Sequence, residues 1–518
     1  MKFDKIIIVG GGSAGWMTAA TLIKTFPKKD ITVLESPNVP IVGVGESTLA
    51  TIKTWTKYLE IDDKEFLSGT NGIYKLSIKF TDFYKKGEAF HYPFGDVELE
   101  GNNAGPNDWW FKKACYPETK NNDYADCIFP SMALVNNNKL FYNLNNELPS
   151  FDFSRNTAYH FDAVKFGMWL KDNYCLPRGV KHIQEDITKI DTDKNGIKSL
   201  NKKYTADLFI DCTGFKSLLL DKTLKEPFEP LTDKLPNNKA WATRIPYRNK
   251  EEELKPYTNC TAIENGWVWN IPLWNRIGTG YVYSDKYVSD EKALKEFKKH
   301  LNRDDVDELE FKNITMRTGI HKRLFVKNVA AVGLAAGFIE PLESNGLYTV
   351  HEFLMALVRN LQREKISQWD KDNYTMQCKR EFYQFAEFVG LHYALSHRDD
   401  TEYWKNNLNK EWSNELIENK PNKYITGYFA AGIDRIDFKF NTIGGLHCIA
   451  AGMNWAPTDI TTLGYHNYMS KDKVKEFFNH FITRLDTKKS NWNKIVENKS
   501  TVINFLKENI YNENSIIK

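Results

Sequence analysis

Six residues near the N-terminus have the types and spacing of a dinucleotide-binding site. Gly10, Gly12 and Gly15 follow a short apolar strand at residues 6–9 and precede a helical pattern, and Glu35 ends a second strand 20 residues beyond Gly15. Glycines at this spacing allow a tight turn and bring backbone amides close to a pyrophosphate, while the acid can bind ribose hydroxyls. The sequence therefore predicts one tightly held dinucleotide. Its predicted contacts are Gly10, Gly12, Ser13, Ala14, Gly15 and Glu35.

A second glycine-rich turn, residues 43–47, lies between a predicted strand and a predicted helix over residues 48–59. Because glycine has no side chain, its backbone can approach a ligand closely. We expect Gly45, Glu46 and Ser47 to wrap around the same dinucleotide. An ordinary turn explains these residues nearly as well.

The run from Val329 to Gly346 combines a small-residue strand, two glycine breaks and the start of a buried helix. Gly333 and Gly337 leave room for the cofactor, and a helix N-terminus favours an anion. Glu343 and Ser344 would then lie beside an anion site. Helix capping in a purely structural strand–turn–helix explains the same two residues equally well, so the sequence leaves both interpretations open.

Composition and length describe the elements that must position these residues. The 518 residues predict two lobes or one large α/β body, and a formal charge of +3 argues against a nucleic-acid partner. Seven scattered cysteines without a CxxC pair predict neither a disulfide framework nor a metal site. No signal-peptide pattern is present, and the longest uncharged apolar run, Val329 to Ile339, is too short to span a bilayer. We expect a soluble cytoplasmic protein without a membrane partner.

The order of patterns along the chain predicts an α/β (α+β) fold. Residues 1–365 should form a nucleotide-binding lobe with inserted strands, including strands at Tyr74–Phe80 and Gly266–Pro272. Residues 101–150 are rich in Asn, Asp and Pro with weak periodicity, which predicts an irregular segment covering a cleft. Residues 366–518 should form a mainly helical lobe that closes the substrate site.

With these motifs placed, the sequence resembles the flavin-dependent halogenases of the tryptophan-halogenase family. The residues that carry the resemblance are Gly10-x-Gly12-x-x-Gly15, Gly266-Trp267-x-Trp269-x-Ile271-Pro272 for the family's GWxWxIP, and Phe338-x-x-Pro341-x-x-Ser344-x-Gly346 for its FxxPxxSxG. The resemblance implies an FAD-binding, Rossmann-like flavin monooxygenase fold with a β-rich insertion and a helical second lobe.

The resemblance also implies a two-component oxidoreductase. A separate flavin reductase, in transient contact, supplies FADH₂, which reacts with O₂ to a C4a-hydroperoxide. A halide ion (bromide, chloride or iodide) attacks this species, and hypohalous acid moves through a tunnel to a small, electron-rich aromatic. By this resemblance Lys79 and Glu343 are catalytic, Asn345 and Gly346 bind the halide, and Trp267 and Trp269 shield the flavin from substrate.

Departures from the family concern the substrate. Tyr92 and Phe94 occupy the stretch where tryptophan halogenases place a stacking His before Pro-Phe. The family's Phe-Trp has no clear counterpart, and the stretch from Gly427 to Gly445 offers Phe440 instead. The residues with which these enzymes hold the amino-acid end of tryptophan have no clear counterpart. We therefore expect Tyr92, Phe94 and Phe440 to contact an indole-like aromatic that lacks a free amino-acid moiety.

Other interpretations of the same residues stay open. A single-component, NAD(P)H-dependent aromatic hydroxylase has the same fold, and an inactive flavin-binding scaffold would have the same glycines. Lys79 and Glu343 could form a structural ion pair, and Trp267 and Trp269, alternating on one side of a strand, could be ordinary core residues. A homo-oligomer is compatible with the sequence.

Overall fold

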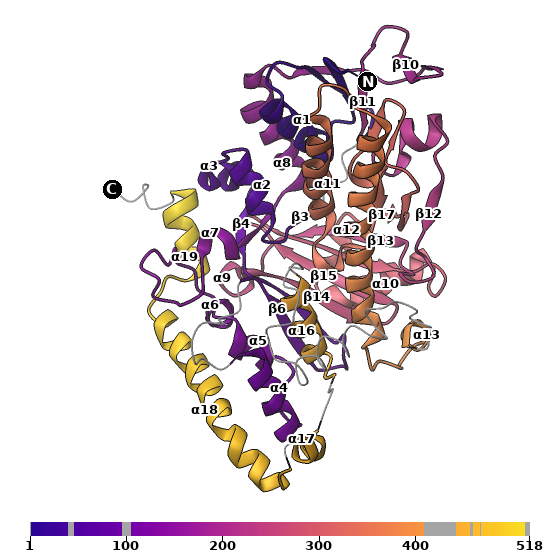
Figure 1. Ribbon diagram of the computed structural model, residues 1–518. Helices are drawn as coiled ribbons and strands as arrows, with labels where there is room; N and C mark the ends of the chain where they lie inside the picture. The colour runs from indigo at the N-terminus through magenta and orange to yellow at the C-terminus, as the bar shows by residue number, and fades with distance from the viewer. Residues whose placement is uncertain are drawn as a thin grey trace. The chain divides into compact units, whose positions relative to one another are not determined.

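The computed structural model describes residues 2–39, 46–95, 105–408, 442–455, 459–466 and 468–512 (Figure 1). Gly45 and Phe440, two of the predicted site residues, lie outside the described residues. The chain forms two compact units that interleave along the sequence. Unit 1 comprises residues 1–73, 159–246 and 273–386, and unit 2 comprises residues 74–158, 247–272 and 387–518. The predicted domain boundary near residue 365 stays a prediction.

Unit 1 is built on a six-stranded, mainly parallel sheet in the order β19-β20-β11-β1-β2-β8. The strands are β1 (Lys5–Val9), β2 (Asp30–Glu35), β8 (Lys181–Gln184), β11 (Leu208–Asp211), β19 (Phe325–Val326) and β20 (Val329–Ala331). The central strands are apolar and buried, as expected where helices cover a parallel sheet. The strand predicted at residues 6–9 and the strand predicted to end at Glu35 are thereby confirmed.

Helices and smaller sheets complete unit 1. Its helices are α1 (Ser13–Thr25), α2 (Ile52–Tyr58), α3 (Asp63–Gly69), α8 (Ala163–Trp169), α10 (Asp290–Leu301), α11 (Gly346–Leu361) and most of α12 (Gln368–Ala394). Strands β13 (Lys239–Ile245), β16 (Ile277–Tyr283) and β17 (Lys312–Thr315) pair antiparallel, as do β12 (Phe228–Pro230), β18 (Gly319–His321) and β21 (Gly337–Phe338). β9 (Ile190–Asp193) and β10 (Gly196–Leu200) form an antiparallel hairpin. Helix α1 packs against α8 and α11, so the glycine turn adjoins the start of both helices.

Unit 2 contains a sheet in which β5 (Ser77–Thr81) lies between β14 (Tyr257–Ile263) and β6 (Ala89–Pro93), with β15 (Gly266–Pro272) beside β14. The strand predicted at Gly266–Pro272 is confirmed. The strand predicted over Tyr74–Phe80 is divided into β4 (Ile73–Lys75) and β5, with a break at Leu76.

The prediction of an irregular segment at residues 101–150 is wrong for residues 106–137, whereas residues 138–150 contain no helix or strand. Residues 106–137 contain α4 (Pro106–Cys115), α5 (Asp123–Ile128) and α6 (Ser131–Asn137). These helices have only 6 to 10 residues, too few for an apolar period to stand out. Their polar residues act at helix ends: Asp108 accepts a hydrogen bond from the Gly105 amide, 2.6 Å away.

The remaining helices of unit 2 follow in the C-terminal part of the chain, apart from two short ones. They are α7 (Phe153–Asn156), α9 (Lys250–Glu253), α13 (Glu402–Leu408), α16 (Thr442–Gly452), α17 (Ile460–His466), α18 (Lys471–Val496) and α19 (Val502–Leu506). Helix α18 packs along α4, α5 and α6 (Figure 1). Over the described residues, every helix is too short or too polar to cross a membrane.

Candidate active site

The glycine turn after β1 has the geometry of a dinucleotide cradle. Gly10 has φ +114°, and a Cβ there would lie 2.3 Å from the carbonyl oxygen of Cys212 on the neighbouring strand. A Cβ on Gly15 would lie 1.9 Å from the Gly10 carbonyl oxygen. At Gly12, by contrast, no described atom lies within 4 Å of the Cβ position, and α1 begins without a side-chain cap. The first amides of α1 are therefore accessible to an anion such as the pyrophosphate of FAD.

Glu35 lies beside this turn, as predicted. Its carboxylate oxygen Oε2 is 2.7 Å from Nε2 of His182 on β8. A Cβ on Gly11 would lie 2.2 Å from the Glu35 carboxyl carbon, so the acid packs directly against the glycine turn. This is the place where a ribose adjoining the pyrophosphate would need a hydrogen-bond acceptor.

Three further predicted cofactor residues are Ser13, in the first turn, and Gly333 and Gly337, before α11. Gly333 (φ +68°) adjoins α1, because a Cβ there would lie 2.9 Å from the Cβ of Ala14. The hydroxyl of Ser13 donates to the carbonyl of Ala163, 3.2 Å away, which ties α1 to α8. Close packing explains the glycine at position 337, because a Cβ there would lie 2.7 Å from the Gly319 carbonyl oxygen on the paired strand β18.

The structure brings the second glycine-rich turn to the start of α11. β3 (Glu46–Ser47) pairs with β7 (Ala158–Phe161), and the hydroxyls of Ser47 and Ser344 are 3.0 Å apart. The Glu46 carboxylate lies 3.7 Å from the Cβ position of Gly346. Two segments about 300 residues apart thus meet, as a shared ligand site requires.

The predicted halide residues begin α11. Ser344 has φ +59°, Asn345 follows, and Gly346 is the first helical residue. The Asn345 side chain is buried, and its Oδ1 has no hydrogen-bond partner among the described residues. Glu343, just before this turn, is fully buried. Helix α11 has no side-chain cap, so its first amides can bind an anion.

Glu46 is an acid close to these amides. Its burial, and then the charge of Asp162, raises the pKa of Glu46 to about 7. Asp162 itself pairs with Arg276 at 2.6 Å. Near neutral pH, therefore, Glu46 changes between a neutral hydrogen-bond donor and an anion beside the start of α11.

In unit 2, the register of the strands places the candidates on two faces of one sheet. Phe80 pairs with Cys260 and with Phe90, and Cys260 pairs with Trp269. Directly paired residues share a face, and residues two apart share it as well. One face therefore carries Trp267, Trp269, Phe80, Phe90 and Tyr92. The rings of Trp267 and Trp269 are 6.2 Å apart and buried.

Lys79 lies on the opposite face. It pairs with Asn259 on β14 and with His91 on β6. Burial, followed by the charge of Lys255, lowers the pKa of Lys79. The structure therefore does not bring Lys79 together with Tyr92 or the two tryptophans. Its catalytic role, and its pairing with Glu343 of unit 1, stay predictions.

Lys75 is a candidate that the sequence analysis did not single out. It is fully buried, and its Nζ lies 4.9 Å from the ring centre of Phe94. The Phe94 ring is 6.1 Å from that of Tyr92, which lies 6.0 Å from Phe388. Lys75 and Phe94 both lie at strand ends, where alternation no longer predicts direction. A second lysine in the same predicted strand was the available signal.

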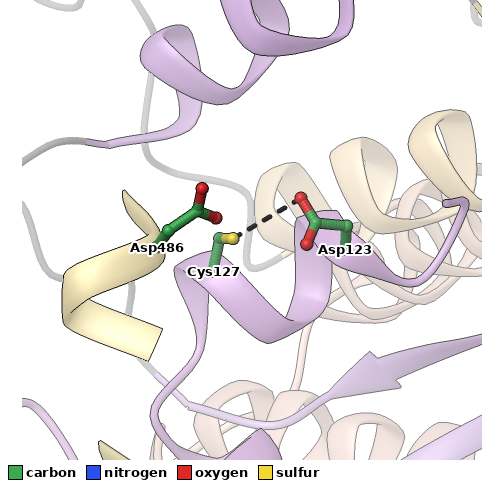
Figure 2. A group of neighbouring side chains, drawn as sticks. All are labelled: Asp123, Cys127 and Asp486. Carbon is green, nitrogen blue, oxygen red and sulfur yellow. Dashed lines mark hydrogen bonds between the residues drawn. The ribbon is translucent and has the colours of Figure 1, made fainter. Parts of the chain in front are cut away.

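One group of side chains in unit 2 has the composition of a metal site. Asp123, Cys127 and Asp486 each offer a ligand atom, all within 4.8 Å of one another (Figure 2). Lys112, however, lies 2.8 Å from Asp123 and 2.7 Å from Asp486, and Lys489 lies 3.0 Å from Asp123. Burial also raises the pKa of the Cys127 thiol. The ammonium groups neutralise the carboxylates, so this is an ion-pair cluster rather than a metal centre.

The chain is similar to known proteins over most of its length. A protein family described as tryptophan halogenase matches residues 5–463. Tryptophan 6-halogenase ThaL of Streptomyces albogriseolus is 32% identical over 493 residues, covering 88% of this chain and 90% of that protein. The solved structure of VirX1 in its apo form is 38% identical with a TM-score of 0.85, covering 99% and 100% of the two chains. The solved structure of tryptophan 6-halogenase SttH from Streptomyces toxytricini is 28% identical with a TM-score of 0.81, and the match covers 97% of this chain and 99% of that one.

A pair of glycine substitutions separates packing from cofactor binding. Gly10→Ala should destabilise the FAD-free protein by about 1–3 kcal/mol, because its Cβ meets the Cys212 carbonyl at a strained φ. Gly12→Ala should melt like the unsubstituted protein without FAD, yet bind FAD at least about tenfold more weakly if its Cβ occupies the pyrophosphate space. Thermal melts and FAD titration measure both; normal FAD affinity in Gly12→Ala would contradict the cradle.

The raised pKa of Glu46 predicts a pH-dependent stability. Glu46 ionises near 4.5 in the unfolded chain and near 7 in the fold, so its contribution to stability falls as pH rises through this interval. The melting temperature of FAD-free Glu46→Gln, minus that of the unsubstituted FAD-free protein, should therefore be higher at pH 8 than at pH 4.5. Glu252→Gln, at an exposed position of α9, is the control. An equal difference at both pH values would exclude a raised pKa.

Proposed function

This chain belongs to the tryptophan halogenase family and is a flavin-dependent halogenase, and on that premise we propose that it installs a halide on an indole-like aromatic without a free amino-acid end. The family implies FAD, a flavin reductase that reduces it and an aromatic substrate. The observation that carries the proposal is the contact of the buried Lys75 with the Phe94 ring, which lies beside the Tyr92 ring. The family match argues against an NAD(P)H-dependent hydroxylase.

The residues of unit 1 fit the cofactor. The open amides at Gly12 would bind the pyrophosphate, and Glu35 would accept hydrogen bonds from the ribose. Reduced FAD supplies the electrons with which O₂ is activated to oxidise a halide ion. The amides at Asn345 and Gly346 would hold that halide, since they begin an uncapped helix of 16 residues.

The tryptophan pair would separate the aromatic substrate from the flavin. Trp267 is fully buried and Trp269 nearly so, in the middle of an ordered strand. Large rings fixed in this way exclude a second aromatic from the volume they fill. Restricting access favours transfer of an oxidised halogen over direct hydroxylation of the substrate.

A lysine must then present the halogen to the ring. An ammonium group donates hydrogen bonds to hypohalous acid and makes its halogen more electrophilic. Lys79 is the candidate from the sequence, whereas Lys75 is the lysine in contact with Phe94. We favour Lys75 because the substrate ring is proposed to stack beside Phe94 and Tyr92. Glu343 would accept the proton that leaves the halogenated carbon.

The aromatic surroundings of Lys75 support a substrate without charged groups. Phe94 contacts Lys75, Tyr92 lies beside Phe94, and Phe388 lies beside Tyr92. A pocket for free tryptophan must pair a carboxylate and an ammonium group, because leaving either unpaired on burial costs affinity. Rings alone recognise an indole through its faces and edges.

Alanine variants of the two lysines distinguish the assignments. Lys75→Ala should lower kcat about 100-fold or more, because it removes the donor that polarises the halogen, while FAD affinity stays normal. Lys79→Ala, the same change four residues away, should retain kcat within a few-fold. Rates are measured with chemically reduced FAD, O₂, bromide and indole. The opposite result would return the catalytic role to Lys79, and normal rates in both would exclude a lysine.

Substrate competition tests the proposed specificity. Indole should be brominated with a higher kcat/KM than tryptophan, since the rings of Phe94, Tyr92 and Phe388 can contact the faces and edges of an indole. Both are supplied together under one source of reduced FAD, and products are counted by mass spectrometry. A clear preference for tryptophan would show that other residues bind its amino-acid end and would contradict this part of the proposal.

A further inference from the structure

The strand that carries Tyr92 is the outer strand of the unit 2 sheet. β6 pairs with β5 on one side only, so amides on its other side need partners. The amide of His91 has one: it donates to Oδ1 of Asn122, 2.8 Å away. Asn122 lies directly before α5. A side chain from the segment predicted to be irregular therefore holds the outer edge of β6.

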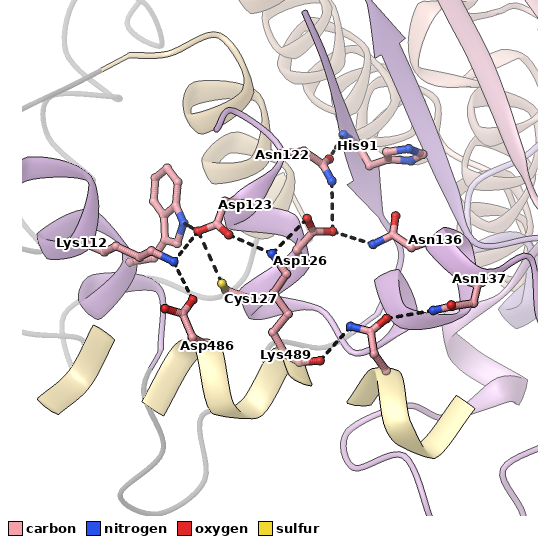
Figure 3. A network of polar contacts seen from close by, with 12 residues as sticks. His91, Lys112, Asn122, Asp123, Asp126, Cys127, Asn136, Asn137, Asp486 and Lys489 are labelled. Atoms are coloured by element: carbon pink, nitrogen blue, oxygen red, sulfur yellow. Dashed lines mark hydrogen bonds and ion pairs between the residues drawn. The ribbon is translucent and has the colours of Figure 1, made fainter. Parts of the chain in front are cut away.

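The orientation of the Asn122 amide is determined by its second contact. Nδ2 of Asn122 donates to Oδ1 of Asp126 at 3.0 Å (Figure 3). A flipped amide would place its carbonyl against the Asp126 carboxylate and its NH₂ against the His91 N–H, losing both bonds. Asn136 also donates to Oδ1 of Asp126, at 2.9 Å, but in the part of the chain that the structure describes it has no hydrogen bond to β6. Asp126 thus keeps the Asn122 oxygen directed at His91.

The ion-pair cluster holds α5 in place. Lys112 of α4 and Lys489 of α18 both pair with Asp123, and Lys489 lies 3.5 Å from Asp126 (Figure 3). The indole N–H of Trp109 donates to Asp123 at 3.1 Å. α5 is therefore held by ion pairs to α4 and α18, and Asn122, directly before α5, holds the His91 amide of β6 in a fixed position.

A small movement of β6 would displace the aromatic site. A Cβ on Gly452 of α16 would lie 2.1 Å from the Phe90 ring, and one on Gly445 would lie 2.7 Å from Tyr92. These rings fit against α16 with no spare room, so a shifted strand must move Tyr92. Phe94, three residues after His91, follows the same strand.

We propose that Asn122 is a positioning residue for the aromatic substrate, acting through the His91 amide to set where Tyr92 and Phe94 hold the ring relative to the lysine. This inference rests on the proposed role of Tyr92 and Phe94 as substrate contacts. It requires that loss of the Asn122 oxygen alter the orientation of the substrate rather than the supply of oxidised halogen. The ring carbon that receives the halogen is then the sensitive readout.

The test compares Asn122→Ala with Asn136→Ala. Both remove an amide that donates to Asp126, but only the first removes the acceptor for His91. Asn122→Ala should raise KM for indole about tenfold and spread bromination over more ring positions, with FAD affinity and FAD oxidation rate unchanged. Asn136→Ala should keep KM and product distribution. Unchanged regioisomers in Asn122→Ala, or the same change in Asn136→Ala, would overturn the proposal.

A conservative variant covers the case in which Asn122→Ala fails to fold. Asn122→Asp combined with Asp126→Asn keeps a side-chain oxygen for the His91 amide and a donor–acceptor contact between residues 122 and 126. This double variant should therefore keep the product distribution, whereas an altered distribution would overturn the proposal. Indole affinity by calorimetry gives a readout independent of turnover, and it should weaken only in Asn122→Ala. If the unsubstituted protein brominates no aromatic, the proposed function itself fails, which is a different outcome from normal bromination that is insensitive to residue 122.

Discussion

The approach of three backbone segments at Gly10 is the constraint on which unit 1 depends. β1, β11 and the start of α1 meet there so closely that a methyl group on Gly10 or Gly15 would overlap a carbonyl oxygen. The same approach leaves the first amides of α1 without a cap. Close packing and an accessible anion site thus come from one arrangement of the backbone, because a residue with a side chain would separate the strands and cover the amides.

Carboxylates in the two units show how surroundings decide the role of an acid. Asp211 accepts four hydrogen bonds, from the Thr213 amide and hydroxyl and from the amides of Leu219 and Leu220. It therefore organises the turn after β11. Asp123 is neutralised by two lysines. Burial, and then the charge of Asp162, raises the pKa of Glu46 to about 7, so its charge can change near neutral pH beside the start of α11.

Alternation along strands explains why the aromatic candidates assemble and Lys79 does not. β5, β6, β14 and β15 are paired with a register that places the tryptophans, Phe90 and Tyr92 on one face. Lys79 is an odd number of residues from Phe80 and Ile78, so it must lie on the other face. The buried lysine that contacts Phe94 lies at the end of β4, which belongs to a different sheet.

The sequence by itself determined the glycine turn with Glu35, the strand of the two tryptophans and the start of α11, because these depend on backbone rules that act over a few residues. The sequence motifs also identified the resemblance to the tryptophan halogenase family. It did not reveal the helices of residues 106–137, which are too short to display a period and are stabilised by α18, hundreds of residues away. Only the tertiary structure decided that Lys75 contacts Phe94 and that Asn122 holds His91. Such contacts depend on strand register and on the direction of side chains at strand ends, and neither is encoded by local spacing.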